Sequence, residues 1–142
     1  MNYQSIRAKI EAPLLAAYNS QAPEIPVYFD NVSVIPPDPP KEYVRINITF
    51  GLTTESTLEG SLDYARGALI IRCFAPKNNG PARCQQMVQI AKGVIDELNS
   101  KNKELGSTYV RIGQITGPSF QAPEAFPHFV GRIDAGWQAS PA

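Results

Sequence analysis

Ala68-Leu69-Ile70-Ile71-Arg72-Cys73-Phe74-Ala75 is the stretch that decides the fold, because it predicts a β-strand with two apolar faces. Successive side chains of a strand point to opposite faces of the sheet. One face then carries Leu69, Ile71, Cys73 and Ala75, and the other carries Ala68, Ile70, Arg72 and Phe74. A strand with one face in water alternates apolar with polar residues, so both faces of this strand are expected to be covered.

Two sources of cover for the second face stay open. The rest of the chain predicts only two amphipathic helices, which are too few to hide both faces of a sheet. The strand is either fully internal to the domain or covered on one face by another copy of the protein. The second alternative places Ile70, Arg72 and Phe74 at or beside a subunit contact.

The composition is that of one neutral domain. A chain of 142 residues is long enough to build a core, so residues 1–142 are expected to form a single unit. Lys and Arg together number 13, as do Asp and Glu, which leaves no net charge. A protein that binds nucleic acid or a membrane surface through a bulk basic field needs a positive excess. We therefore expect neither sequence-specific nucleic-acid binding nor membrane association.

The sequence also lacks the usual marks of export. No apolar run approaches the ~18 residues that span a bilayer. The N-terminal residues do not place a basic segment before an apolar one, as a secretory signal does. Cys73 and Cys84 are too few for a disulfide framework and are expected to be reduced, partly buried thiols. These features favour an intracellular domain.

The first half of the chain predicts a helix, two strands and two unusual connections. Ile6, Ile10 and Leu14 lie four residues apart and predict an amphipathic helix over residues 3–19, kinked or divided at Pro13. The segments after it are a short strand at 27–31, a stiff Pro-rich connector at Ile35–Pro40, a one-faced strand at 42–50 that ends at Gly51, and a polar arm at about 52–64.

The second half predicts three strands and one helix. The strand that contains Ala68–Ala75 runs from about Arg66, and a helix follows at Ala82–Leu98. Strands are predicted at 108–116 and 129–137, with a loop rich in Pro and Gly at 117–127 between them. Strand runs separated by helices without regular alternation indicate an α+β fold. We predict a mainly antiparallel sheet of about five strands with two helices, in the order α-β-β-β-α-β-β.

The polar arm is acidic. It carries Glu55, Glu59 and Asp63 and contains neither Lys nor Arg. Connections of this length in a compact domain are usually either disordered or functional. The arm is therefore interpreted either as a solvated acidic segment or as a segment that contacts a partner.

No arrangement of residues predicts catalysis. The chain has one histidine, His128, and no Ser or Cys motif that would make it part of a catalytic triad. A zinc site made only of His and Cys would need His128, Cys73 and Cys84 together, in a spacing that no zinc motif uses. No glycine-rich segment carries the Lys of a phosphate-binding loop. We expect no enzyme activity, no catalytic or metal-ligating residues and no cofactor.

Arginines interrupt the predicted strands. An RNA-reading sheet is conceivable if they share one face with Tyr43 and Tyr109, but the order of elements differs from that of an RNA-recognition motif. Ion-paired arginines or arginines at a subunit contact fit the pattern better. The four residues are Arg45, Arg72, Arg111 and Arg132.

The order and placement of the elements resemble the tail-terminator family of long-tailed bacteriophages, also called minor tail or tail-completion proteins. The resemblance covers nearly all of the chain. It rests on the opening helix at Ile6–Tyr18, the Pro-rich connector Ile35–Pro40, the strand Tyr43–Phe50 with its polar arm, the run Arg66–Pro76, and the helix Ala82–Leu98 with two closing strands.

The resemblance implies a structural protein of the virion. Family members form a ring, commonly a hexamer, that caps the tail tube and stops its polymerisation. The partners implied are further copies of the chain, the tail tube protein, the head–tail connector and, in a contractile tail, the sheath protein. The protein would be made in the host cytoplasm and end at the head-proximal end of the tail. In this setting Glu55, Glu59 and Asp63 would face the lumen or a partner.

Two other classes of function remain open. One is another ring protein of the phage neck or head–tail connector, for which ring formation would stay and the partner would change. The other is a small ligand-binding α+β domain. The number of subunits per particle separates the ligand-binding class from the two ring classes.

Overall fold

The computed structural model describes residues 3–32, 41–54, 64–78, 80–101, 109–122 and 127–140. It confirms the α+β class and the predicted order of elements. The predicted Pro-rich connector and the middle of the acidic arm, with Glu55, Glu59 and Asp63, lie outside the described residues. The elements are α1 (Tyr3–Asn19), β1 (Val27–Tyr28), β2 (Tyr43–Thr54), β3 (Tyr64–Pro76), α2 (Ala82–Lys101), β4 (Tyr109–Gln121) and β5 (His128–Ser140).

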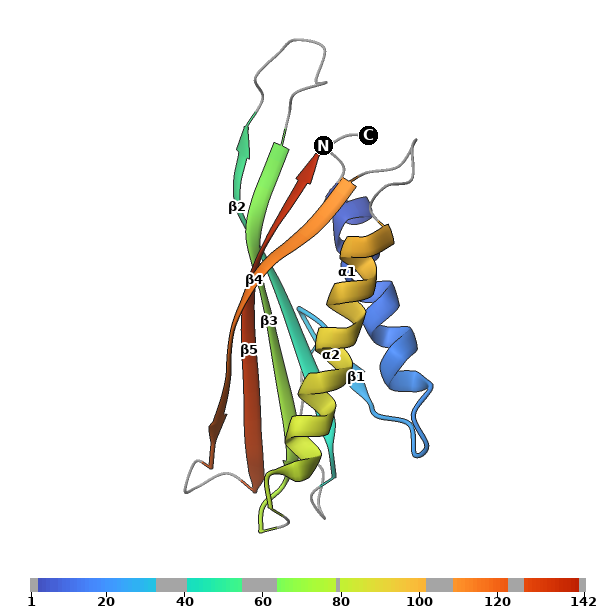
Figure 1. Cartoon of the computed structure of the whole chain (residues 1–142), viewed down its shortest axis with the longest axis vertical. Coiled ribbons are helices and arrows are strands. Elements are labelled where there is room, and N and C mark those ends of the chain that lie inside the picture. The colour runs from blue at the N-terminus through green and yellow to red at the C-terminus, as the bar shows by residue number, and fades with distance from the viewer. Residues whose placement is uncertain are drawn as a thin grey trace.

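The molecule has two layers, a sheet and a pair of helices (Figure 1). The strand order is β1-β2-β3-β5-β4, and every pairing is antiparallel except that of the short β1 with β2. Helices α1 and α2 lie side by side against the same face of the sheet. We call this the helix face, and the opposite side the open face. β3 pairs with β2 on one side and β5 on the other, so it is the central strand of the sheet.

The core lies between the helices and the helix face. The predicted stripe of α1 is buried: Ile6, Ile10, Leu14 and Tyr18. Helix α2 adds Cys84, Met87, Val88, Ala91 and Ile95. Leu69, Ile71 and Cys73 of β3 meet these side chains from the sheet, while Ile70 and Arg72 point the other way and keep part of their surface exposed.

Tyr18 and the two cysteines are buried polar and thiol groups between the helices and the sheet. The Tyr18 hydroxyl donates a hydrogen bond of 2.8 Å to the Met87 carbonyl oxygen, which joins α1 to α2 inside the core. Cys73 and Cys84 are both buried free thiols. Burial raises the pKa of the Cys73 thiol to about 12, so this side chain is protonated and unreactive at neutral pH.

Several boundaries differ from the sequence-based expectation. Helix α1 continues through Pro13 without dividing into two. Strand β2 passes Gly51, because the register shifts between Phe50 and Leu52 in a bulge, and pairing resumes as far as Thr54. The predicted polar arm therefore begins and ends as strand.

Strand β4 was also predicted too short. It runs to Gln121, with register shifts between Ile112 and Ile115 and between Thr116 and Ser119. β4 lies at the edge of the sheet, where a proline such as Pro118 is tolerated because one side of the strand needs no partner. Half of the predicted Pro- and Gly-rich loop is thus strand.

The centre of the sheet contains one very close contact. Gly67 lies opposite Phe50 on β2 and Trp137 on β5. A Cβ atom at Gly67 would overlap the Thr49 carbonyl oxygen and would lie 2.8 Å from Cζ2 of Trp137. Only glycine fits here, because the Thr49 carbonyl group and the Trp137 ring occupy the space that a Cβ atom would need.

We predict that Gly67→Ala lowers the free energy of unfolding by about 2 kcal/mol, since the added methyl group must displace backbone or the Trp137 ring. Gly93→Ala is the matched control. No atom of the described residues lies within 4 Å of a Cβ placed at Gly93, in helix α2, so this change should raise stability by about 0.5–1 kcal/mol. Urea denaturation followed by circular dichroism measures both, and equal effects would contradict the packing argument.

Candidate interaction surface on the open face

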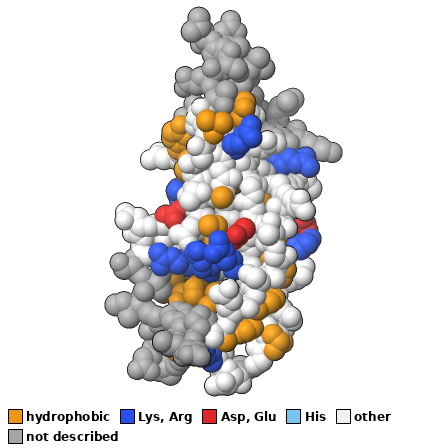
Figure 2. All heavy atoms as spheres, turned by 90° about the vertical axis from the view of Figure 1, so that its left-hand side faces the viewer, with side chains coloured by type: hydrophobic (Ala, Val, Ile, Leu, Met, Phe, Trp, Pro, Cys, Tyr) orange, Lys and Arg blue, Asp and Glu red, His pale blue; other side chains and the backbone are white. Residues whose placement is uncertain are grey.

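Three arginines form a row across the open face. In the register of the sheet, Arg45 on β2 lies opposite Arg72 on β3, and Arg72 lies opposite Arg132 on β5. Neighbouring strands are about 4.8 Å apart, so the three side chains emerge from adjacent positions. Figure 2 looks onto this side of the molecule, and a band of Lys and Arg side chains crosses its middle. We call Arg45, Arg72 and Arg132 the arginine row.

The three guanidinium groups have different partners. Arg132 is held by Asp134 on its own strand, with Nε and Nη2 donating to the two carboxylate oxygens at 2.7 and 3.1 Å. Arg72 Nη1 donates to Oδ1 of Asn47 at 2.9 Å. Among the described residues, no carboxylate lies within ion-pair distance of Arg72 or Arg45. The row therefore has more positive than negative charge.

Arg72 occupies the least favourable position for a cation. Burial and the positive charges of Arg132 and Arg45 lower its pKa, and Asp134 only partly opposes them. A guanidinium remains protonated at any physiological pH, so the repulsion persists in the folded protein. A carboxylate placed on this part of the open face would relieve it.

A hydrogen-bond network behind the row connects the open face to helix α1. Asp30 follows the short strand β1 at the edge of β2, where the Ile48 N–H has no strand partner and donates to Asp30 Oδ2 at 3.0 Å. Asn47 Nδ2 donates to Asp30 Oδ1 at 2.6 Å, and Arg7 Nη1 donates to Oδ2 at 2.6 Å. Asn47, which accepts the hydrogen bond from Arg72, is thus held in place by its own hydrogen bond to Asp30.

The charge of Asp30 is stabilised by these three donors. Partial burial alone would raise the pKa of its carboxyl group, but the Ile48 N–H, Arg7 and Asn47 together lower it below the ordinary value. The network has no counterpart in the sequence pattern, since Asp30 and Asn47 are 17 residues apart and only the parallel pairing of β1 with β2 brings them together.

Apolar side chains surround the arginine row. Ala68 and Ile70 on β3 and Val130 on β5 lie on the open face and are half-buried. No helix of the described residues lies over them (Figure 1). Arginine is enriched in protein–protein contacts, so a surface that places arginines beside half-buried apolar groups is a candidate for such a contact.

One end of the open face is closed by an aromatic cluster. Phe74 stacks on Tyr43 with ring centroids 4.3 Å apart, and the His128 ring meets Tyr43 edge-on at 5.2 Å. His128 is fully buried and its Nε2 forms a 2.8 Å hydrogen bond with the Lys41 backbone oxygen. This is the structural role expected of a histidine at the start of a strand.

The predicted contact residues and arginines are only partly brought together. Ile70 and Arg72 lie on the open face with exposed surface, whereas Phe74 shares that face but is buried against Tyr43. Arg111 lies opposite Gln138, six residues along β5 from Arg132, and so stands apart from the row.

The three residues considered for a zinc site are separated by the sheet. Cys73 and Cys84 belong to the helix side, while His128 belongs to the open-face aromatic cluster. In the described part of the chain, no group of three His, Cys, Asp or Glu side chains is placed to hold a metal ion. Neither helix there is long and apolar enough to cross a membrane.

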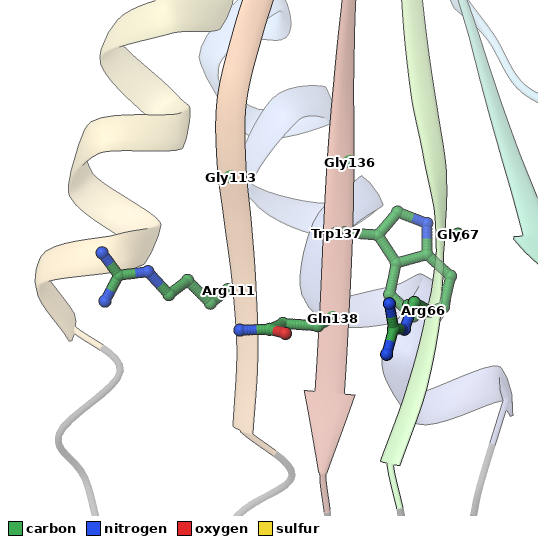
Figure 3. Close-up of a pocket in the computed structure, with 7 residues that line it drawn as sticks. All are labelled: Arg66, Gly67, Arg111, Gly113, Gly136, Trp137 and Gln138. Atoms are coloured by element: carbon green, nitrogen blue, oxygen red, sulfur yellow. The ribbon is translucent and has the colours of Figure 1, made fainter. Parts of the chain in front are cut away.

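A shallow depression of about 320 Å³ lies farther along the sheet (Figure 3). Glycines form its floor, because they leave backbone exposed where other residues would place side chains. Arg66 on β3 and Arg111 on β4 lie at its two sides. The Arg66 guanidinium is engaged over the Tyr64 ring, 5.2 Å from its centroid. The lining residues are Arg66, Gly67, Arg111, Gly113, Gly136, Trp137 and Gln138.

We predict that Asp30→Asn lowers the free energy of unfolding by about 1 kcal/mol at neutral pH, because it removes a charged acceptor shared by three donors. A carboxyl group with a lowered pKa in the folded state stabilises the protein above its ordinary pKa of 3.8, and this contribution is lost as the pH falls through the folded value. The difference between the two proteins should therefore shrink in acid.

Asp96→Asn is the control for that measurement. Asp96 forms only an exposed ion pair with Lys92, so its loss should cost about 0.3 kcal/mol. Denaturation curves recorded across a series of pH values give all three stabilities. An Asp30→Asn effect no larger than that of Asp96→Asn would show that the network does not hold the open face.

Comparison with known proteins shows the fold only. No protein-family model matches the sequence, and no curated protein is significantly similar to it. Among the solved structures that match is a protein whose name states no function. Its similarity extends over 100% of this chain and 98% of its own, with a TM-score of 0.68 and 23% sequence identity. The two-layer arrangement of helices and sheet is therefore one that an experimentally determined protein adopts.

Proposed function

We propose that this protein is a tail terminator of a long-tailed bacteriophage, a ring of identical subunits that caps the tail tube. The ring stops polymerisation of the tube and offers its other side to the head–tail connector. Two observations support the proposal. They are the order of the elements, α-β-β-β-α-β-β, and a sheet face that no helix of the described residues covers. The open face is the observation that carries it.

A closed ring makes specific demands on its subunit. Its contacts are heterologous, so each copy must offer two different surfaces that fit each other. The open face supplies a surface of the right kind, with Ile70, Ala68 and Val130 half-buried beside the arginine row. The absence of net charge on the chain leaves little overall repulsion between copies.

Capping needs shape and contact rather than chemistry. A terminator must fit the tube on one side and must fail to recruit a further tube ring on the other. No step of this requires a nucleophile, a metal ion or a cofactor. The tail tube protein, the connector and, in a contractile tail, the sheath are the partners that the proposal names.

We predict that the purified protein forms closed rings, most simply hexamers, visible by negative-stain electron microscopy and countable by native mass spectrometry. Ile70→Asp should convert them to folded monomers, because it places a charge at a half-buried position of the open face. Ile70 is a better probe than Phe74, which stacks on Tyr43 inside the subunit. Gln89→Glu on the exposed surface of α2 is the control and should leave rings intact.

A monomeric wild-type protein at high concentration would remove both ring functions and favour the ligand-binding alternative. Circular dichroism of Ile70→Asp separates loss of assembly from loss of folding. If the variant assembles like the wild type, the open face is not a ring contact.

We predict that deleting the gene from the phage that carries it yields overlong or polydisperse tail tubes and heads without tails, because polymerisation has lost its stop. Purified protein added to growing tubes should restore a defined end, and Ile70→Asp should not. Tail lengths are measured on electron micrographs. Tubes of normal length that fail to join heads would favour a connector instead.

A further inference from the structure

We propose that the arginine row of one copy binds the acidic stretch 52–64 of a neighbouring copy. The inference rests on the proposed ring, since it assigns one of the contacts between subunits. The arginine row has three guanidinium groups and one paired carboxylate, that of Asp134. The stretch 52–64 carries three carboxylates and contains neither Lys nor Arg.

The positive charge of the arginine row attracts anions and repels the same row of another copy. Arg45 and Arg72 have no carboxylate within ion-pair distance among the described residues, and Arg132 alone is held by Asp134. Two copies that met open face to open face about a two-fold axis would place one row near the other and bring like charges together. The occupant of this face therefore comes from a different, acidic part of its partner.

The described surface of the chain offers almost no spare carboxylates. Glu24 is the one described acidic residue that takes part in none of the ion pairs. The others are already paired: Glu11, Asp30, Glu42, Asp96, Glu97 and Asp134. The part of the stretch that lies outside the described residues, 55–63, carries Glu55, Glu59 and Asp63 within nine positions. It is the strongest concentration of negative charge in the sequence.

Chain length disfavours contact between this stretch and the arginine row of its own subunit. It is anchored at Thr54 and Tyr64, which face each other across the β2–β3 pair. Arg72 lies eight residues along β3 from Tyr64, a distance of about 26 Å. The five residues from Thr54 to Glu59 span at most about 17 Å at full extension. The backbone at Glu59 therefore stops about 9 Å short of the Arg72 backbone even in a fully straightened stretch. Contact within one chain would require the stretch and both side chains to extend along the same line, so a second copy is the better source of the carboxylates.

The open face fits a protein segment better than a nucleic acid. Base recognition on a sheet uses exposed aromatic rings, but Tyr43 and Phe74 are buried against each other. Ala68, Ile70 and Val130 instead offer apolar contacts beside the arginines. The stretch 52–64 carries Leu52, Leu58 and Leu62 among its acidic residues, which matches such a surface.

The first test uses the stretch itself as a probe. A fluorescent peptide with the sequence of residues 52–64 is titrated with the full-length wild-type protein, diluted until native mass spectrometry shows monomers so that no neighbouring copy occupies the arginine row, and binding is followed by fluorescence anisotropy. Arg72→Gln and Arg45→Gln, each made in the wild-type chain, should weaken binding of the peptide about tenfold. Arg111→Gln is the matched control, an exposed arginine on the same face about 20 Å from the row.

The controls of this titration decide between occupants. A peptide with Glu55, Glu59 and Asp63 changed to their amides should bind at least tenfold more weakly than the acidic one. Single-stranded oligothymidylate should not compete with the acidic peptide. No binding of the peptide to any form of the protein, equal binding by Arg72→Gln, Arg45→Gln and the wild type, or displacement by oligothymidylate would overturn the proposal. Thermal unfolding of each variant confirms that it is folded.

The second test is a charge exchange in the whole chain. One variant carries Arg45→Glu and Arg72→Glu, and the other carries Glu55→Lys, Glu59→Lys and Asp63→Lys. Each alone should lower the fraction of protein in rings, and the chain that carries both sets should recover it. Recovery is expected only if the two sets of charges meet.

The outcome separates this inference from the proposed function. Rings that form normally in either single set would overturn the docking of the acidic stretch while leaving the terminator proposal standing. A wild-type protein without rings would overturn the terminator proposal, and the peptide titration would still report on the arginine row. Loss of rings in all three variants, without recovery in the combined chain, would also contradict the inference.

Discussion

The register of β3 between β2 and β5 is the constraint on which the rest of the structure depends. It places Leu69, Ile71 and Cys73 under the helices and Arg72 on the open face. A slip of one residue would reverse every side chain and carry Arg72 into the core, where a guanidinium without a partner is very costly. The same register sets Arg45, Arg72 and Arg132 side by side. One set of backbone pairings thus builds both the core and the surface.

The arginine row exists at some electrostatic cost, which the surrounding residues limit. Asp134 neutralises one guanidinium, and Asn47 orients another through the network that runs by Asp30 to Arg7 on helix α1. None of these contacts gives Arg72 a carboxylate of its own. Features that lower the stability of an isolated subunit are common where a protein meets a partner, because binding supplies the missing charge.

Local sequence patterns were sufficient for the helices and for the class of fold. The stripe from Ile6 to Tyr18 repeats with helical spacing and is buried as expected, and the helix predicted at 82–98 buries the residues from Cys84 to Ile95 that share one of its sides. Strand ends were less predictable, because Gly51 and Pro118 read as breaks but lie at a bulge and on an edge strand. The two apolar faces of β3 were correctly recognised, although Phe74 on the second face is buried by Tyr43 within the subunit rather than left for a partner.

By itself, the sequence determined the order of the elements, the apolar faces that form the core and the absence of net charge. These properties depend on residues close together in the chain, and they follow from periodicity and composition. Only the tertiary structure decided that the arginines of three strands form a row, that Asp30 supports Asn47 from behind, and that both helices cover the same face. The reason is physical: cross-strand register and the choice of face are set by the packing of segments that lie far apart in the sequence.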